Sequence, residues 1–140
     1  MQSNVKSGAI RVLAGEDLSD KEGYLVKMTH ASGVPEVVLP TANGDDALYV
    51  VEDDGEDAEF VDVSPLTPDR QVRIKLEGTC SPGDRLVLAD VATPADKGMV
   101  RKIPTAAGTY RVLAVAEEAG VDGQLVLARP AHLGLVTVTE

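Results

Sequence analysis

The sequence predicts an all-β fold, a compact antiparallel sandwich or barrel built from two internally repeated β units of about 60 residues, with an extended N-terminal arm. Three observations support this prediction. Short apolar runs of alternating hydrophobicity are separated by Gly and Pro turns. Only residues 114–119 resemble a helical turn, and no window shows a sustained helical period with a cap. The hexapeptide at residues 39–44 (Leu-Pro-Thr-Ala-Asn-Gly) returns nearly unchanged at residues 103–108.

The repeat extends beyond this hexapeptide. Three further pairs of segments align in the same order along the chain: 22–26 with 82–87, 52–55 with 117–120, and 60–65 with 125–130. Apolar runs fall opposite apolar runs, and turn residues fall opposite turn residues. We interpret this pattern as two copies of one β unit, the alternative being a chance similarity between Gly- and Pro-punctuated strands.

In the first half of the chain, we expect a first strand at residues 9–13, followed by strands of the first unit at 23–30, 35–39, 47–51 and 58–63. Tyr24, Val26 and Met28 alternate with Leu25, Lys27 and Thr29, which indicates a strand. Residues 31–33 (Ala-Ser-Gly) favour the turn of a hairpin. Residues 40–46 form a loop in this prediction, and 52–57 form an acidic turn around Gly55.

In the second unit, Val72, Ile74 and Leu76 alternate with charged residues and predict a strand with one wet, basic face over residues 70–77. We expect further strands at 84–89, 99–103, 109–116, 124–128 and 135–139, with a loop at residues 130–134. The predicted organisation is therefore an N-terminal arm and first strand at 1–15, an acidic β unit at 16–69, and a second β unit at 70–140 that shares one core with the first.

The charge distribution argues against nucleic acid and anionic membranes as partners. The formal net charge is −10, and it is carried by residues 1–69, which have 4 Lys/Arg and 15 Asp/Glu, whereas residues 70–140 have 9 and 8. An acidic surface repels phosphate-rich partners. There is no apolar run of 18 residues and no apolar stretch typical of a signal peptide, so we expect neither a membrane span nor a signal.

Residues able to carry chemistry are few. His30 and His132 are far apart in sequence and lack metal-ligand spacing, and Cys80 lies in a Gly- and Pro-bounded turn. The acidic turn at 52–57 is either a solvated surface or a weak cation site, because its spacing does not fit an EF-hand loop. No nucleophile elbow, phosphate loop or zinc-protease motif occurs. We therefore predict no catalytic residues, no metal, no cofactor and no enzyme activity.

The second half carries a recognisable pattern in four segments: 82–87 (Pro-Gly-Asp-Arg-Leu-Val), 98–100 (Gly-Met-Val), 108–118 (Gly-Thr-Tyr-Arg-Val-Leu-Ala-Val-Ala-Glu-Glu) and 123–130 (Gly-Gln-Leu-Val-Leu-Ala-Arg-Pro). This pattern resembles the capsid decoration, or head cement, proteins of tailed bacteriophages. The resemblance implies a non-catalytic virion protein, made in the host cytoplasm, that binds the major capsid protein on the outer surface of an assembled head and stabilises it. It also implies a homo-oligomer, with a trimer favoured.

Two segments are candidates for capsid binding. The first is the N-terminal arm, with Val5, Lys6, Ile10, Arg11 and Val12, which we expect to add to a sheet edge of the capsid protein. Its alternatives are disorder and an edge strand within the same molecule. The second candidate is the basic face of Arg70, Arg73 and Lys75, extended by Arg101 and Lys102, with an ordinary solvated strand face as the alternative.

Two other functions remain open from the sequence. One is a different structural β module of a virion or cell surface, such as a tail, baseplate or assembly protein. The other is an enzyme or small-ligand binder, which would need a concave pocket with several convergent polar groups.

Overall fold

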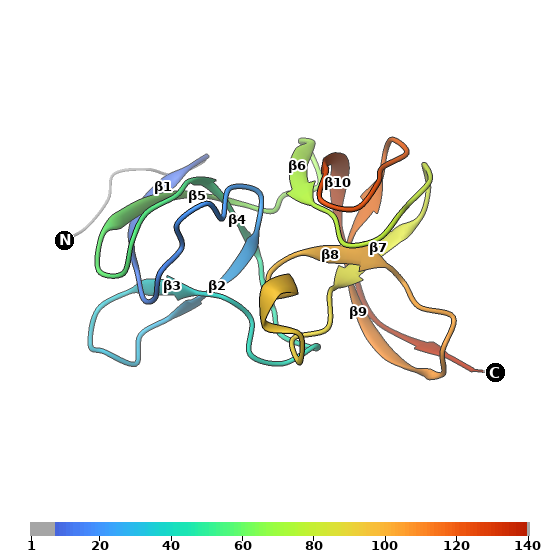
Figure 1. The fold of residues 1–140 in the computed structure, drawn as a ribbon, viewed down its shortest axis with the longest axis horizontal. Helices are drawn as coiled ribbons and strands as arrows, with labels where there is room; N and C mark the ends of the chain where they lie inside the picture. The colour runs from blue at the N-terminus through green and yellow to red at the C-terminus, as the bar shows by residue number, and fades with distance from the viewer. Residues whose placement is uncertain (1–7, 140) are drawn as a thin grey trace.

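The protein is an all-β molecule with two lobes arranged along its long axis, as seen in the computed structural model, which describes residues 8–139 (Figure 1). The first lobe contains β1 (Ile10–Ala14), β2 (Leu25–Thr29), β3 (Glu36–Val38), β4 (Tyr49–Asp53) and β5 (Phe60–Pro65). The second contains β6 (Val72–Lys75), β7 (Arg85–Leu88), the 3₁₀ turn η1 (Pro94–Asp96), β8 (Val100–Lys102), β9 (Gly108–Ala116) and β10 (Leu125–Val138). The predicted all-β class is confirmed, whereas the two-unit repeat and the extended N-terminal arm stay predictions.

The first lobe is a closed barrel with the strand order β1-β3-β2-β4-β5. Its pairs are antiparallel except β1–β3, which is parallel over Leu13 and Ala14. Closure through Leu13 and Ala14 shortens the open edge that a flat five-stranded sheet would present, and leaves the first three residues of β1 paired on one side only. We call this lobe the first barrel.

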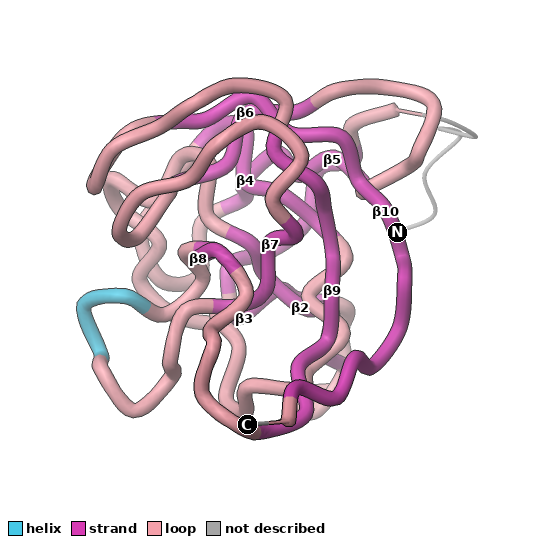
Figure 2. The backbone as a smooth tube through the Cα atoms, turned by 90° about the vertical axis from the view of Figure 1, so that its right-hand side faces the viewer, coloured by secondary structure: helices cyan, strands magenta, loops and turns pink. Residues whose placement is uncertain are grey.

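The second lobe, here called the second sheet, repeats this arrangement. Its strand order is β6-β10-β9-β7-β8, and a parallel bridge from Leu76 to Val100 joins the two outer strands. Thus β6, β7, β8, β9 and β10 occupy the places of β1, β2, β3, β4 and β5. Figure 2 shows β9 and β10 running side by side, with η1 at the periphery.

The correspondence between the lobes extends to single backbone hydrogen bonds. Gly23 donates to Val51 O in the first barrel, and Gly83 donates to Ala116 O in the second sheet, both at 2.8 Å. Three further bonds of the first barrel have counterparts in the second sheet. In the first barrel they run from Val51 N to Tyr24 O, from Leu18 N to Gly55 O, and from Ala58 N to Ala14 O. Their counterparts run, in the same order, from Ala116 N to Asp84 O, from Cys80 N to Gly120 O, and from Gly123 N to Leu76 O. Ala58 and Gly123 also share a positive φ, of 67° and 82°. The shared pairing agrees with the predicted repeat, whose origin by duplication stays a prediction.

The structure aligns the two hexapeptides differently from the sequence. Gly15 N donates to Val37 O, and Glu77 N donates to Val100 O, so Val37 and Val100 are counterparts. Leu39 therefore corresponds to Lys102, one residue away from the sequence match to Ile103. The sequence match and the strand pairing therefore differ by one residue here, and only the strand register shows which residues occupy equivalent places.

Two predicted features differ in the structure: the loop at residues 130–134 and the helical turn at residues 114–119. The predicted loop at 130–134 lies within β10, which runs from Leu125 to Val138 and absorbs the irregularity as a bulge between Pro130 and Gly134. The possible helical turn near residue 114 is instead the end of β9. The helical turn that does form, η1, lies between the strands predicted at 84–89 and 99–103 and begins with Pro94, a residue that favours the first helical position.

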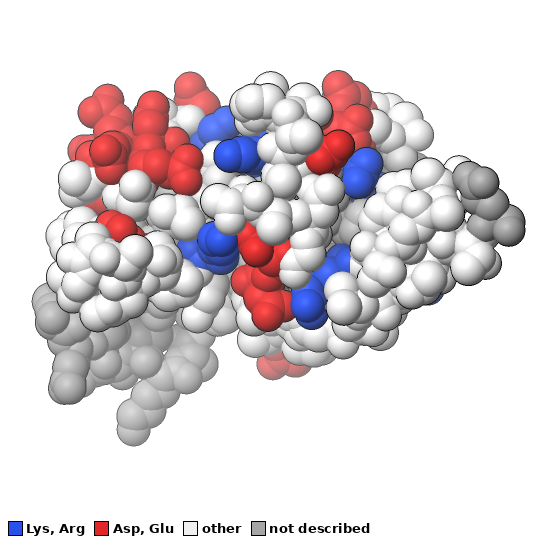
Figure 3. Space-filling view, turned by 90° about the horizontal axis from the view of Figure 1, so that it is seen from below, with Lys and Arg blue, Asp and Glu red and all other residues white. Residues whose placement is uncertain are grey.

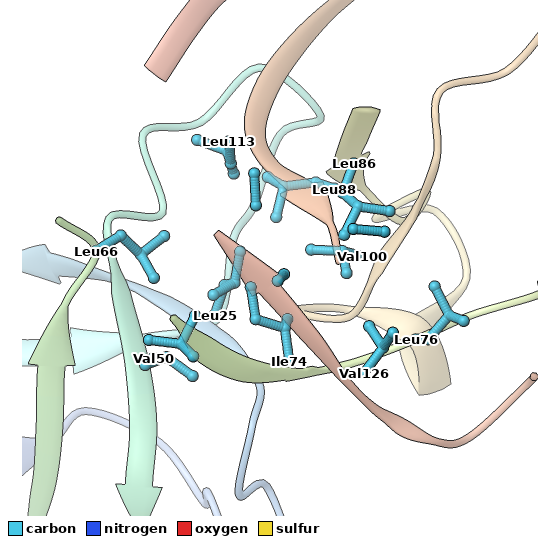
Figure 4. Close-up of a cluster of buried hydrophobic side chains, with 14 of the residues drawn as sticks. Leu25, Val50, Leu66, Ile74, Leu76, Leu86, Leu88, Val100, Leu113 and Val126 are labelled. Atoms are coloured by element: carbon cyan, nitrogen blue, oxygen red, sulfur yellow. The ribbon is translucent and has the colours of Figure 1, made fainter. Parts of the chain in front are cut away.

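The apolar interior consists of two clusters, each crossing the boundary between the lobes. One cluster lies mainly within the first barrel and includes Ala89 and Met99 from the second lobe. The other lies mainly within the second sheet and includes four residues from the first lobe: Leu25, Ala47, Val50 and Leu66. Figure 4 shows Leu25, Val50 and Leu66 directed toward Ile74 and its neighbours. The lobes therefore share buried apolar surface.

Candidate interaction surfaces

Two of the three residues first considered for chemistry, Cys80 and His132, make contacts within the fold. Cys80 is 6% exposed, and its Sγ lies 3.6 Å from Glu118 O. Burial raises the pKa of this thiol, which disfavours the reactive thiolate. His132 Nε2 lies 3.0 Å from Leu66 O and links β10 to the end of the first lobe, whereas His30 is exposed at the start of the β2–β3 turn. The two histidines are thus not brought together.

Carboxylates within and just after the acidic turn at residues 52–57 accept hydrogen bonds from backbone N–H groups. Asp54 Oδ2 accepts a hydrogen bond from Asp20 N at 2.6 Å, and Glu59 Oε1 accepts one from Glu56 N at 2.7 Å. Across residues 8–139, no group of three His, Cys, Asp or Glu side chains is placed to hold a metal ion. Over the same residues, no helix is long and apolar enough to cross a membrane.

The predicted arm is described only in part. Val5 and Lys6 lie outside the described residues. Ile10, Arg11 and Val12 belong to β1, where they pair with β5. The Val12 side chain is buried at 6% exposure, while Arg11 is exposed and bonds Asp62 at 3.2 Å, with its guanidinium over the Phe60 ring. The strand that we expected to add to a partner is therefore already an element of the first barrel.

The predicted basic face is partly neutralised by contacts within the chain. Alternation along β6 places Arg73 and Lys75 on the same side, and Arg70 precedes the strand as an exposed residue. Arg73 pairs with Glu118 at 2.8 Å and donates to Leu125 O at 3.1 Å. Lys75 is half-buried beside the first barrel. The two residues predicted to extend this basic face also have partners within the chain: Arg101 donates to Leu88 O, and Lys102 Nζ lies 3.8 Å from Asp84 Oδ2.

Figure 3 shows the charge on one face of the molecule. Acidic side chains gather over the end formed by the first lobe, and Lys and Arg lie nearer the middle and the second lobe, interspersed with acids. A contact between unlike lobes is therefore electrostatically easier than one between two first lobes.

Sequence reasoning did not identify a groove on the first barrel, beside β1. It has a volume of about 270 Å³ and is lined by Arg11, Val12, Leu13, Val34, Pro35 and Phe60. Val34 and Phe60 are 44% and 46% exposed, which is high for large apolar side chains. The only sequence signal was the apolar residue pair Val34-Pro35 in a hairpin turn that is otherwise polar.

These features define a class of protein: an acidic, two-lobed β body that presents, among residues 8–139, exposed strand edges, exposed charges and an apolar groove. No known protein-family model matches the chain, and no curated protein is similar to it in sequence. Among solved structures, the crystal structure of the head fiber gp8.5 N base of bacteriophage phi29 has a similar fold. It is 18% identical in sequence with a TM-score of 0.66, and the match covers 91% of this chain and 97% of that one. This likeness establishes the fold.

Proposed function

We propose that the protein is a structural, non-catalytic component of a phage virion that binds the outer surface of the assembled head and stabilises it, as a decoration or cement protein. The observation that carries the proposal is the match of nearly the whole chain, in both lobes, to the base of a phage head fiber. The decoration-protein pattern of the second half supports it from an independent direction.

The architecture suits a binding role. A closed barrel and a second sheet that share buried surface form a rigid body. A protein that binds the assembled head and not the free subunit stabilises the head by mass action, and repetition over many sites multiplies a modest gain at each.

The proposed capsid-binding element is the arm that precedes β1, with Val5 and Lys6, and the exposed cations Arg70 and Arg11 are secondary contacts. Gly8, with a φ of 85° and free space around it, marks the point at which the described chain enters the barrel. An extended segment can gain affinity by adding main-chain hydrogen bonds to a sheet edge of the capsid protein.

Co-sedimentation tests the function. The chain is mixed with expanded heads, with precursor heads and with free subunits of the major capsid protein of the same virus. We expect it to pellet with expanded heads alone and to raise the temperature at which they break. Failure to bind heads in any state would reject the proposal.

Removal of residues 1–7 tests the arm in the same assay. We expect at least a tenfold loss of head affinity with an unchanged urea midpoint of the free protein, since β1 itself is retained. Undiminished binding by the truncated protein would remove the arm from the proposal while leaving the function standing.

A further inference from the structure

The two lobes are joined through a backbone contact in which a turn of one docks on a strand edge of the other. Residues 22–25 form a turn that leads into β2. Lys75 N donates to Gly23 O at 2.9 Å, and Leu25 N donates to Gly98 O at 2.7 Å. The turn thus lies between β6 and the residues before β8. Gly23 has a φ of 82°, which favours glycine, and a Cβ at this position would displace the end of the Leu125 side chain.

The second sheet presents the same turn, but to solvent. Residues 81–85 lead into β7, and Ser81, Pro82, Gly83 and Arg85 are exposed. Gly83 N donates to Ala116 O, and Asp84 O accepts from Ala116 N. In the first barrel, Gly23 N donates to Val51 O, and Tyr24 O accepts from Val51 N in the same way. Equivalent geometry directs the Gly83 carbonyl away from β9, as it directs that of Gly23 away from β4. Arg85 faces the β8 side, where its carbonyl accepts a hydrogen bond from Ile103 N at 2.9 Å.

In the second sheet, the turn at residues 22–25 docks on the edge of β6, which we call a receiving edge. The first barrel has a corresponding receiving edge along β1, the counterpart of β6. The β1–β3 register contains only Leu13 and Ala14, so Ile10, Arg11 and Val12 pair with β5 alone. Ala14 donates to Glu59 O and accepts from Ala58 N on the β5 side. Alternation along the strand therefore turns the backbone N–H and C=O of Arg11 to the other side, which is the side of the groove.

The wall of the groove resembles the surface on which Gly23 is seated. Ala14 and Leu76 occupy equivalent places, so the residues that precede them, Leu13 and Lys75, do as well. Leu13 pairs with Phe60, and Lys75 pairs with Leu125, which makes Phe60 the counterpart of Leu125. Phe60 is 46% exposed, whereas Leu125 is 36% exposed and contacts the docked turn. The first barrel thus has an edge and an apolar wall on which no turn from residues 8–139 is seated as the turn at 22–25 is on β6.

The two receiving edges differ in register. In the first barrel, Leu13 pairs directly with Glu36, whereas its counterpart Lys75 bonds the docked turn. An incoming turn therefore meets β1 at Arg11, the next residue whose backbone faces the groove.

We propose that the groove binds residues 81–85 of a second copy of this chain, so that copies associate head to tail through a contact equivalent to the one between their own lobes. The charge distribution favours this partner, because residues 1–69 carry most of the acids and residues 70–140 are nearly neutral. Head-to-tail contact joins unlike lobes and avoids placing two acidic lobes together. Such a contact closes into a ring or extends as a chain, according to the rotation between copies.

Two variants each remove one side of the contact. Gly83→Asn blocks the turn: the position has a φ of 90° and no atom within 4 Å of an added Cβ, and Asn tolerates positive φ better than other side chains. Phe60→Asp places a carboxylate in the groove. Gly123→Asn, with a φ of 82° and equally free space, and Leu133→Asp, 55% exposed in β10, are the matched controls.

Sedimentation equilibrium of the free protein, without heads, is the measurement. We expect the wild type and both controls to exceed the chain mass of 14.7 kDa with rising concentration, and each contact variant to stay at that mass. Circular dichroism melts verify that all four variants fold.

Mixing the two contact variants tests the head-to-tail geometry. Gly83→Asn keeps its groove and Phe60→Asp keeps its turn, so an equimolar mixture should form a species of two chains and no larger one. A monomeric wild type, contact variants that associate like the wild type, or a mixture that stays monomeric would each overturn the proposal. Because no head is present, these results are independent of head binding.

Discussion

Asp45 organises the loop between β3 and β4. Its Oδ2 accepts hydrogen bonds from Lys27 Nζ at 2.9 Å, Thr41 N at 2.8 Å and Ala42 N at 3.1 Å. Burial by itself raises the pKa of this carboxyl, but these donors, with the charge of Lys27, outweigh it and lower the pKa to about 2. The ionised form is thus tied to the folded loop.

Replacing Asp45 tests this link through pH. The pKa of Asp45 is about 2 in the folded protein, against 3.8 for the ordinary carboxyl group. The ionised carboxylate therefore adds to the free energy of unfolding, fully above about pH 4, and this contribution is lost as the pH falls toward 2. We expect Asp45→Asn to lower the free energy of unfolding at pH 7 by about 2 kcal/mol. In urea titrations from pH 7 to pH 2, the difference from the wild type should shrink with acidification. Asp57→Asn, in an exposed turn, is the control, and a pH-independent difference would contradict the account.

Residue-scale features were the least predictable from sequence. Lys27 stood out as the last cation before Arg70, but its pairing with Asp45 depends on a loop that folds back over β2. The same holds for Arg111, which bonds Gly44 O at 2.8 Å and Asp46 at 3.2 Å across the lobe boundary. Neither partner is close enough in sequence for a local rule to identify it.

At the scale of elements, the turn at residues 22–25 joins the lobes because glycines permit close approach on both sides. Gly98, opposite this turn, has a φ of 86°. A Cβ at this position would lie 2.9 Å from Leu25 O and 2.9 Å from Leu39 Cδ2. The backbone carbonyl cannot move away without breaking the hydrogen bond that Leu25 N makes with Gly98 O.

Gly98→Ala should therefore destabilise the protein by more than the cost of positive φ alone, which is about 1 kcal/mol. The control is Gly78→Ala, which has a φ of 79° and no atom within 4 Å of the added Cβ. Thermal melts of the two variants separate the clash from the backbone strain. Equal melting temperatures would show that the junction accommodates a methyl group.

The strands themselves were largely predictable, because alternation and turn residues are local signals. Residues 109–116 alternate regularly and form β9 at Gly108–Ala116. The continuity of β10 was not predictable: Pro130 interrupts the pattern, and the strand persists since β9 pairs with it on both sides of the bulge.

At the scale of the whole molecule, the lobes depend on each other. Leu25 is fully buried, yet it belongs to the first barrel and packs in the cluster of the second sheet. Conversely, Met99 belongs to the second lobe and packs in the cluster of the first barrel. Separation of the lobes would expose apolar residues on both sides, so neither has a complete core alone.

Expression of residues 1–69 and 70–140 as separate chains tests this dependence. We expect the intact protein to unfold in one cooperative transition, and each fragment alone to lack a cooperative melt and to bind a hydrophobic dye. Nuclear magnetic resonance spectra of the fragments, separately and mixed, provide the measurement. Native-like dispersion in an isolated fragment, or two transitions in the intact chain, would show that the lobes are independent.

The sequence by itself determined the fold class, most strand positions and the uneven charge, because alternation, turn residues and net charge are properties of neighbouring residues or of simple counts. The tertiary structure decided which strands close the first barrel, the one-residue shift between the hexapeptides, and the groove beside Phe60. Each of these depends on contacts between residues distant in the chain, whose register and burial no local pattern specifies.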